Sequence, residues 1–191
     1  FEGFKAGVYT FRSENSSKQW ATSYDFGAIE AGHVVKTELR DGGLALAQAY
    51  VFNLRREKFQ DPLVREALGL MFNFEWSNEQ LFYGLYDRVN SFWGNSELEA
   101  VGVPVGDELA VLQSLVDQGL IHDDILTAPA VMAPVSGSRQ LDRKSLRRAS
   151  FLMDQAGWLV NSDGMREKNG QVFTLEVLAG SPAFDRITNP M

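Results

Sequence analysis

YVFNLRREKFQDPLVREALGLMFNFEWSNEQLFYGLYDRVNSFWGNSEL, residues 50–98, is the stretch of sequence that best predicts the fold. It begins as an apolar extended segment that ends at Asn53. A helical pattern follows, in which Asp61 is a suitable N-cap and Pro62 fits the first helical position, where an N–H group is not needed. Apolar residues then recur at helical spacing from Val64 to Met71. A buried strand followed by an amphipathic helix predicts a mixed α/β (α+β) fold in which helices predominate.

Helices and strands are also predicted on both sides of this stretch. Gly7, Gly119 and Gly157 each follow a helical pattern and are expected to end a helix. The expected helices cover residues 1–6, 17–24, 75–86, 107–116 and 143–156. The expected strands cover residues 8–11, 33–39, 44–52, 158–160 and 171–178, with a turn at residues 41–43 and the polar connection NSDGMREKNG between the last two strands. Residues 127–138 are predicted to form an irregular loop.

The composition excludes several classes of function. The 191 residues carry a formal net charge of -7, whereas a nucleic-acid-binding protein needs clustered Lys and Arg to neutralise phosphates. The only basic cluster, residues 139–148, has the pattern of the outer face of a helix. No apolar run approaches the roughly 20 residues that cross a bilayer. The chain has no cysteine, which excludes thiol catalysis and thiolate metal sites and fits an oxidising compartment.

The sequence predicts no metal site, no cofactor and no catalytic residue. His33 and His122 lie in different segments, and the adjacent Asp123 and Asp124 point apart on regular structure. The NSDGMREKNG stretch lacks the ordered carboxylates of a calcium loop and is read as a hairpin turn. No nucleophile elbow or phosphate-binding glycine loop is present. A pair of carboxylates brought together by the fold remains open, and with it an unrelated hydrolase as an alternative function.

Aromatic residues are concentrated between positions 72 and 93. Phe72, Phe74 and Phe82 fall at helical spacing and are expected in the core, as aromatics at that spacing usually are. Four others lie beside glycines and polar residues, where they are candidates to line a cleft: Tyr83, Tyr86, Phe92 and Trp93.

Several motifs, taken in order, resemble the extracellular solute-binding proteins of family five, the peptide/nickel class, and within it the oligopeptide-binding branch. The central motif, read as basic-x-x-F-x-D-x-x-V-R-x-A-L-x-x-A-x-D, is similar to residues 56–73. Asn73 stands where an acidic residue usually closes this motif, and Gly94 stands where the branch commonly has an acidic residue. The other similar stretches are FEGFKAGVYTFR, SSKQWATSYDF, AYVFN, LFYGLYDRVNSFWGNSEL and SLRRASFLMDQAGW.

The resemblance implies part of a periplasmic protein whose two lobes close around an oligopeptide. Residues 1–49 would be a remnant of the first lobe, and residues 50–191 the hinge strand and the N-terminal part of the second. The chain is accordingly expected to be an internal piece of a longer protein. It would be non-catalytic and would deliver peptide to the membrane permease of an ATP-driven (ABC-type) importer. The residues implied as ligand-binding are Phe52, Asn53, Arg55, Trp93 and Asn95.

Another ligand within the same class also remains open. A nickel chelate, a sugar or an opine would use the same two-lobe architecture. Arg55 is of particular interest because a guanidinium binds a carboxylate bidentately, although a surface arginine after a strand has the same sequence pattern.

Overall fold

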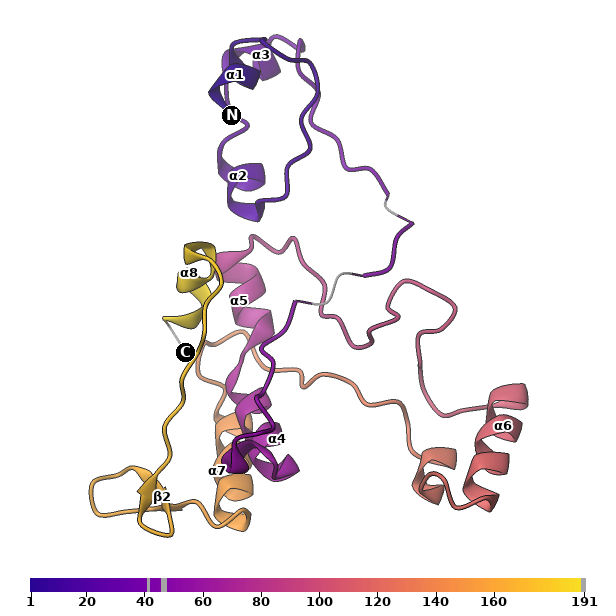
Figure 1. The fold of residues 1–191 in the computed structure, drawn as a ribbon. Coiled ribbons are helices and arrows are strands. Elements are labelled where there is room, and N and C mark those ends of the chain that lie inside the picture. The colour runs from indigo at the N-terminus through magenta and orange to yellow at the C-terminus, as the bar shows by residue number, and fades with distance from the viewer. Residues whose placement is uncertain (41, 46–47, 190–191) are drawn as a thin grey trace. The chain divides into compact units, whose positions relative to one another are not determined.

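The computed structural model describes residues 1–40, 42–45 and 48–189, and the chain divides into two compact units (Figure 1). The larger unit comprises residues 1–39, 51–87 and 134–191, and the smaller unit comprises residues 40–50 and 88–133. Helices and one small antiparallel sheet make up the regular structure, which confirms the predicted mixed α/β class. None of the helices in the described ranges is long and apolar enough to cross a membrane.

The core of the larger unit lies between α4 (Pro62–Met71) and α7 (Arg143–Gln155), which pack side by side (Figure 1). Each helix begins where the sequence predicts, because the side chains of Asp61 and Asp142 accept hydrogen bonds from the first-turn N–H groups of Leu63 (2.9 Å) and Ser145 (2.7 Å). Small residues at the contact allow the two backbones to approach closely. The buried apolar residues are Phe59, Val64, Ala67, Ala149, Leu152, Met153, Ala156 and Trp158.

A three-stranded antiparallel sheet follows α7: β1 (Leu159–Val160), β2 (Arg166–Lys168) and β3 (Gln171–Val172). The prediction that NSDGMREKNG forms a single turn is wrong, because residues 166–168 within it form β2. The Asn161 side chain accepts hydrogen bonds from the N–H groups of Asp163 and Met165, each with a length of 3.0 Å. These bonds close a first turn before β2. Asn169 and Gly170, with φ angles of 55° and 75°, form the second turn.

Three expected strands in the first half of the chain are not formed within the described residues. Val8 is instead bound through its N–H to the carbonyl of Gly3 (2.8 Å), which closes α1 (Glu2–Lys5). The stretch after His33 is held by a side-chain hydrogen bond instead of by β-sheet pairing, since Lys36 Nζ donates to the carbonyl of Trp20 at a distance of 2.6 Å. Residues 48–52 form no strand, and residues 41, 46 and 47 of the expected turn and strand lie outside the described residues.

The remaining helices of the larger unit are short. The helix expected over residues 75–86 is α5 (Phe74–Leu81), and it ends early because Tyr83 and Gly84 adopt positive φ angles of 61° and 70°. α2 (Ser17–Thr22) begins where the helix over residues 17–24 is predicted to begin, with Ser16 as its N-cap. Four helices described in the larger unit were not predicted: α3 (Gly27–Glu30) and α8 (Asp185–Thr188), and the 3₁₀ helices η1 (Glu57–Phe59) and η3 (Pro182–Phe184).

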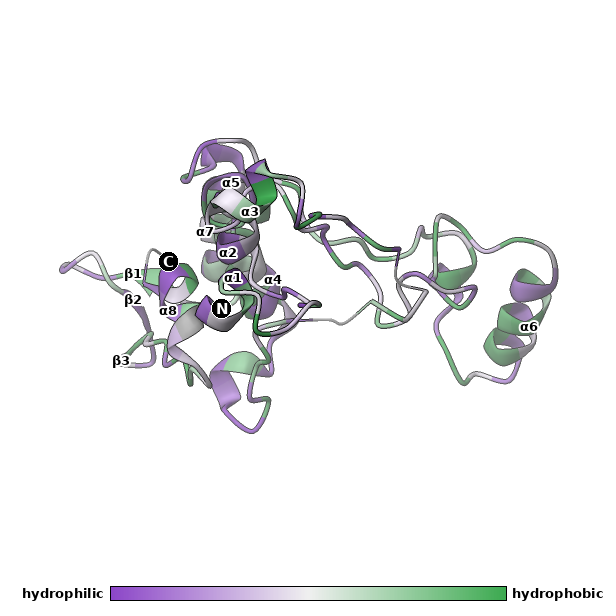
Figure 2. Cartoon of the chain, turned by 90° about the horizontal axis from the view of Figure 1, so that it is seen from above, coloured by the Kyte–Doolittle hydropathy of each residue, from purple (hydrophilic) through white to green (hydrophobic). Residues whose placement is uncertain are grey.

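The smaller unit contains α6 (Gly106–Asp117) and the 3₁₀ helix η2 (Asp123–Leu126), which pack against each other. Hydrophobic and hydrophilic residues alternate along α6, as the sequence predicts for an amphipathic helix (Figure 2). Gly119, with a φ angle of 69°, follows the end of α6 as expected. None of the hydrophobic side chains described in this unit is buried.

The contact between α4 and α7 predicts the effect of truncating a core side chain. Leu152 is fully buried (0% exposed), and Leu152→Ala should lower the free energy of unfolding by about 2–5 kcal/mol through lost burial and a residual cavity. Leu159→Ala is the matched control, because Leu159 is exposed on β1 and should cost no more than about 0.5 kcal/mol. Chemical denaturation measures both, and equal losses would contradict the assigned core.

Candidate functional site

Three of the predicted ligand-binding residues, Phe52, Asn53 and Arg55, lie in the larger unit just before η1. The ring of Phe52 packs on the buried ring of Phe59 with centroids 5.4 Å apart, so part of its surface belongs to the core. Asn53 ends the extended segment, because its side-chain oxygen accepts a hydrogen bond from the N–H of Arg55 over 3.1 Å. The guanidinium of Arg55 is exposed and has no protein partner among the described residues, which leaves it available to an anion.

The other two predicted residues, Trp93 and Asn95, lie in one turn of the smaller unit. Trp93 is 50% exposed, whereas Asn95 holds the backbone together. The Asn95 side-chain amide donates to the carbonyl of Gly43 over 2.7 Å, and its N–H donates to a carboxylate oxygen of Glu99 over 3.2 Å. The positive φ angle of Asn95, 64°, suits an asparagine in such a turn.

Gly94 has a packing reason for being a glycine. Its carbonyl accepts a hydrogen bond from the N–H of Ala45 over 2.9 Å, and a Cβ atom built on Gly94 would lie 3.2 Å from the Cβ atom of Ala45. An acidic side chain at this position would therefore require the 42–45 segment to shift.

The five predicted residues thus fall into two local groups, one in each unit. Asn53 and Arg55 contact each other, and Trp93 and Asn95 share a turn. A common cleft for the two groups stays a prediction.

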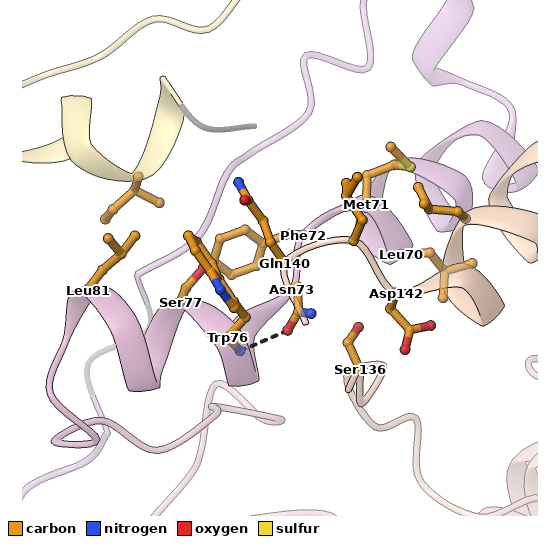
Figure 3. A pocket seen from close by; sticks show the side chains of 13 residues that line it. Leu70, Met71, Phe72, Asn73, Trp76, Ser77, Leu81, Ser136, Gln140 and Asp142 are labelled. Carbon is orange, nitrogen blue, oxygen red and sulfur yellow. Dashed lines mark hydrogen bonds between the residues drawn. The ribbon is translucent and has the colours of Figure 1, made fainter. Parts of the chain in front are cut away.

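A pocket of about 60 Å³ lies in the larger unit beside Asn73, between α5 and the loop that precedes α7 (Figure 3). Trp76, Ser136 and Asp142 lie around it, and its apolar lining includes side chains of α4, α5, α7 and α8. Ligand pockets for drug-sized molecules measure roughly 300–1,000 Å³, so this volume is too small for a peptide. The pocket instead lies beside a cluster of polar side chains, Asn73, Glu75 and Asp142, which we call the polar junction.

Asn73 is the centre of this junction and is only 7% exposed. Its side-chain oxygen accepts a hydrogen bond from the N–H of Trp76 over 2.9 Å and caps α5. Its side-chain amide donates to the carbonyls of Gly137 (2.8 Å) and Arg139 (2.7 Å). An aspartate would keep the first bond and lose the other two, so the departure at Asn73 from the family motif has a structural reason.

Two carboxylates complete the junction. Glu75 accepts a hydrogen bond from the N–H of Ser136 over 2.9 Å, and Asp142 accepts one from the N–H of Gly137 over 3.1 Å. The pKa of Asp142 is lowered, chiefly because its carboxylate also accepts a hydrogen bond from the N–H of Ser145 at the start of α7. The side chains of Asn73, Glu75 and Asp142 thus each bind backbone groups.

A second charged group is buried near the N-terminus. The Glu14 side chain is 2% exposed and pairs with Arg12 over 2.9 Å. Burial alone would raise the pKa of Glu14, but hydrogen bonds from Arg12, the N–H of Ser16 and the Tyr24 hydroxyl more than offset it, and the pKa is lowered. Burial raises the pKa of Tyr24, and the hydrogen bond to Glu14 is the main cause that raises the pKa of Arg12. This network ties α2 to the preceding segment.

Neither group of carboxylates belongs to a metal-binding cluster within the described ranges. No cluster of three or more His, Asp or Glu side chains able to hold a metal ion occurs there. No buried side-chain N or O atom of the described residues lacks a hydrogen-bond partner.

Sequence reasoning missed the Asn73 junction. The position was read only as a departure from an acidic residue, because its partners Gly137 and Arg139 lie 64 and 66 residues further along the chain. The one available signal was local: an asparagine three residues before Trp76, between two helical patterns, is a typical N-cap.

Comparisons with known proteins give a consistent result along the whole chain. The family profile described as "Bacterial extracellular solute-binding proteins, family 5 Middle" matches residues 2–191. The "Probable peptide-binding protein YejA" of Agrobacterium fabrum is 40% identical over 193 residues, which cover 100% of this chain and 31% of that protein. The "Peptidoglycan-binding protein YepA" of the same organism is 31% identical, over 98% of this chain and 31% of that protein.

A relative from Escherichia coli, named YejA, is 34% identical over 93% of this chain and 29% of its own length. The chain therefore spans about three-tenths of the length of these relatives.

The junction predicts a specific effect of the motif's usual acidic residue. Asn73→Asp should lower the free energy of unfolding by about 1–3 kcal/mol, because the carbonyls of Gly137 and Arg139 would lose their donor. Asn169→Asp, in the exposed turn between β2 and β3, makes the same chemical change and should cost less than about 0.5 kcal/mol. Chemical denaturation at neutral pH compares the two, and equal stability of both variants would argue against the junction.

The lowered pKa of Asp142 predicts a pH dependence. A carboxylate whose pKa is lower in the folded than in the unfolded state stabilises the fold above its unfolded pKa, and this contribution is lost as the pH falls through the folded pKa. Asp142→Asn keeps a capping oxygen but does not titrate. Between about pH 5 and pH 2, stability should therefore fall more steeply in the wild type than in Asp142→Asn. Denaturation curves measured across this range would be parallel if the carboxylate made no difference.

Proposed function

Because the chain belongs to the bacterial extracellular solute-binding proteins of family 5, we propose that it is part of a periplasmic protein that binds peptides. The observation that carries the proposal is the match along residues 2–191, together with 40% identity to a relative whose name describes peptide binding. The protein is non-catalytic in this proposal and supplies its ligand to the permease of an ATP-driven importer.

Peptide capture uses the two-lobe architecture inferred from the sequence. The lobes close around the ligand at a hinge, with residues 1–49 in the first lobe and residues 50–191 in the hinge and second lobe. Backbone hydrogen bonds supply much of the affinity, and water in side-chain pockets allows many peptide sequences to bind. The ligand-binding residues remain those predicted: Phe52, Asn53, Arg55, Trp93 and Asn95.

Arg55 has the clearest role within this proposal. Its exposed guanidinium is free of protein partners among the described residues and is suited to the carboxylate of a peptide C-terminus. Trp93, with half of its surface exposed, offers an aromatic face to a side chain. Asn95 acts indirectly, by fixing the turn that carries Trp93.

A second candidate ligand is a peptide attached to cell-wall sugars. The specific observation in its favour is that one relative, 31% identical over 98% of this chain, is named as a peptidoglycan-binding protein. The same cleft and the same Arg55 contact would serve both ligands.

The experiment uses the family-length protein from the same gene, freed of endogenous ligand. After incubation with a defined mixture of peptides, native mass spectrometry should detect protein bearing one intact peptide. Parallel incubations with a muropeptide, a nickel chelate and a sugar distinguish the other ligand classes. Steady cleavage of the peptides, or retention of only a non-peptide ligand, would refute the proposal.

Arg55 gives this experiment a residue-level control. Arg55→Ala should weaken binding of a peptide with a free C-terminus by about 10-fold or more, and binding of the C-terminal amide much less, because a charge-assisted pair is worth roughly 1.5–3 kcal/mol. Arg56→Ala, at the next position and also exposed, is the matched control and should bind both peptides as the wild type does.

A further inference from the structure

The start of α7 carries a dense group of cations in an otherwise acidic chain (α7 is orange in Figure 1). Five of the 18 Lys and Arg residues fall within positions 139–148, although the formal net charge of the chain is -7. All five are exposed, and we call them the basic patch: Arg139, Arg143, Lys144, Arg147 and Arg148. The opposite face of α7, with Ala149 and Leu152, is buried against α4. The cations are therefore on the outer face of the helix.

Neighbouring side chains neutralise only part of this charge. Arg148 pairs with Glu66 of α4 over 3.1 Å, and both side chains are about half exposed. Asp142 lies within the same stretch of sequence, where its carboxylate accepts hydrogen bonds from backbone N–H groups. The other four cations of the basic patch form no ion pair within the described residues. Five cations against two carboxylates leave three net positive charges.

The position of these cations does not stabilise α7. Cations near the N-terminus of a helix oppose its macrodipole, and Arg143 and Lys144 stand in the first turn. Apart from the cap, Asp142, that turn has no acidic residue, and the last turn has no basic residue. A departure from a local stability rule without a compensating contact is typical of a functional surface.

Two exposed apolar side chains accompany the basic patch. Leu141, which precedes α7, is 68% exposed, and Phe151 is 52% exposed. Phe151 lies one turn beyond Arg147 on the same face of the helix. The guanidinium carbon of Arg148 is 5.8 Å from the centre of the Phe151 ring. Phe151 therefore shares its face of α7 with the cations.

This arrangement suits an extended anionic surface. None of the five cations lines the pocket beside Asn73, so that pocket is not a site for a small anion. Protein interfaces concentrate apolar residues at their centre and charges at their rim. Here the cations fill the middle of the sequence stretch, and Leu141 and Phe151 lie towards its ends. An anionic bilayer offers phosphates to the cations and an acyl-chain boundary to the apolar side chains.

We propose that the basic patch docks the protein on the surface of a membrane that contains anionic phospholipids. The guanidinium and ammonium groups contact the headgroup phosphates, and Leu141 and Phe151 reach the boundary with the acyl chains. Each Lys or Arg near such a surface strengthens binding roughly fivefold, so three net charges give about a 100-fold preference over a neutral membrane. The inference goes beyond peptide binding and holds whichever ligand the protein takes.

The net negative charge of the chain does not prevent this docking. At about 0.1 M salt the Debye length is about 10 Å, so acidic residues further than this from the membrane are largely screened. The cations of the basic patch contact the headgroups directly and are screened less.

Vesicle binding tests the proposal on the wild-type sequence. The family-length protein should co-sediment with phosphatidylcholine vesicles that contain about 30% phosphatidylglycerol, about 100-fold more strongly than with phosphatidylcholine alone. Binding should be lost near about 1 M salt, where the Debye length is about 3 Å. Equal binding to both kinds of vesicle, or no binding to either at low salt, would overturn the proposal.

A charge-matched pair of triple variants locates the binding surface. The first variant, R143Q/K144Q/R147Q, removes three cations of the basic patch and leaves the ion pair of Arg148 intact. The second, K18Q/R40Q/R56Q, makes the same change in net charge at exposed positions elsewhere. Affinity for the anionic vesicles should fall at least about 20-fold in the first and less than about threefold in the second. Similar losses in both would show that only net charge matters and would overturn the patch.

The melting temperatures of the two triple variants check that both remain folded. Each should melt within about 2 °C of the wild type or above it, because the replaced side chains are exposed and form no ion pair within the described residues. The wild-type comparison of vesicles needs no variant, so it decides the proposal even if one of them unfolds.

A second pair of variants distinguishes a membrane from other anionic partners. Phe151→Ala should weaken binding to the anionic vesicles about fivefold, because half of the ring is free to enter the lipid, whereas Phe11→Ala, also exposed, should leave it unchanged. Equal binding of both variants would overturn the docking mode. Displacement by inorganic phosphate at constant ionic strength would make a free phosphate the ligand. Binding to polyglutamate but not to vesicles would make an acidic protein the partner; both results overturn the proposal.

Discussion

The packing of α4 against α7 is the contact on which the rest of the larger unit depends. Neither helix is long enough to be stable alone, so burial of Val64, Ala67 and Leu152 between them supplies much of the free energy that holds both. The sheet is attached to this pair through Arg166, which donates to the carbonyl of Trp158 over 2.7 Å and pairs with Asp154 on α7. A change at the helix contact therefore reaches the sheet.

α5 plays a different role, because its side chains bind two segments of the larger unit, one just before residue 88 and one just after residue 133, where the chain passes between the units. Asn78 accepts a hydrogen bond from the N–H of Tyr86 and donates to its carbonyl, and Asp87 is the last residue of the larger unit before residue 88. Glu75 holds Ser136, two residues after the chain returns at Pro134. Polar side chains of α5 thus fix the backbone at Tyr86 and at Ser136. Apolar contacts alone, which have no preferred direction, would fix these backbone positions less precisely.

Sequence reasoning succeeded where the signal is local. The starts of α2, α4 and α7 and the glycines that end helices need only their neighbours in the chain, and each is found where predicted. Strands failed because a ladder needs a partner that the sequence does not identify, as residues 8–11 and 33–39 illustrate. The site is the extreme case, since the five predicted residues occupy both units and their common role stays a prediction.

The central motif explains why the family could be identified from the sequence more readily than the ligand. In F-x-D-x-x-V-R-x-A-L, Phe59, Val64 and Ala67 are buried and Asp61 caps α4. Arg65 donates hydrogen bonds to the carbonyls of Phe59 and Gln60, each with a length of 2.7 Å, and so closes the turn before the helix. Each of these residues builds the start of α4, and none is spare for a ligand. A motif made of caps and core specifies a fold, while the specificity of the cleft depends on exposed residues such as Arg55 and Trp93, whose patterns also occur on ordinary surfaces.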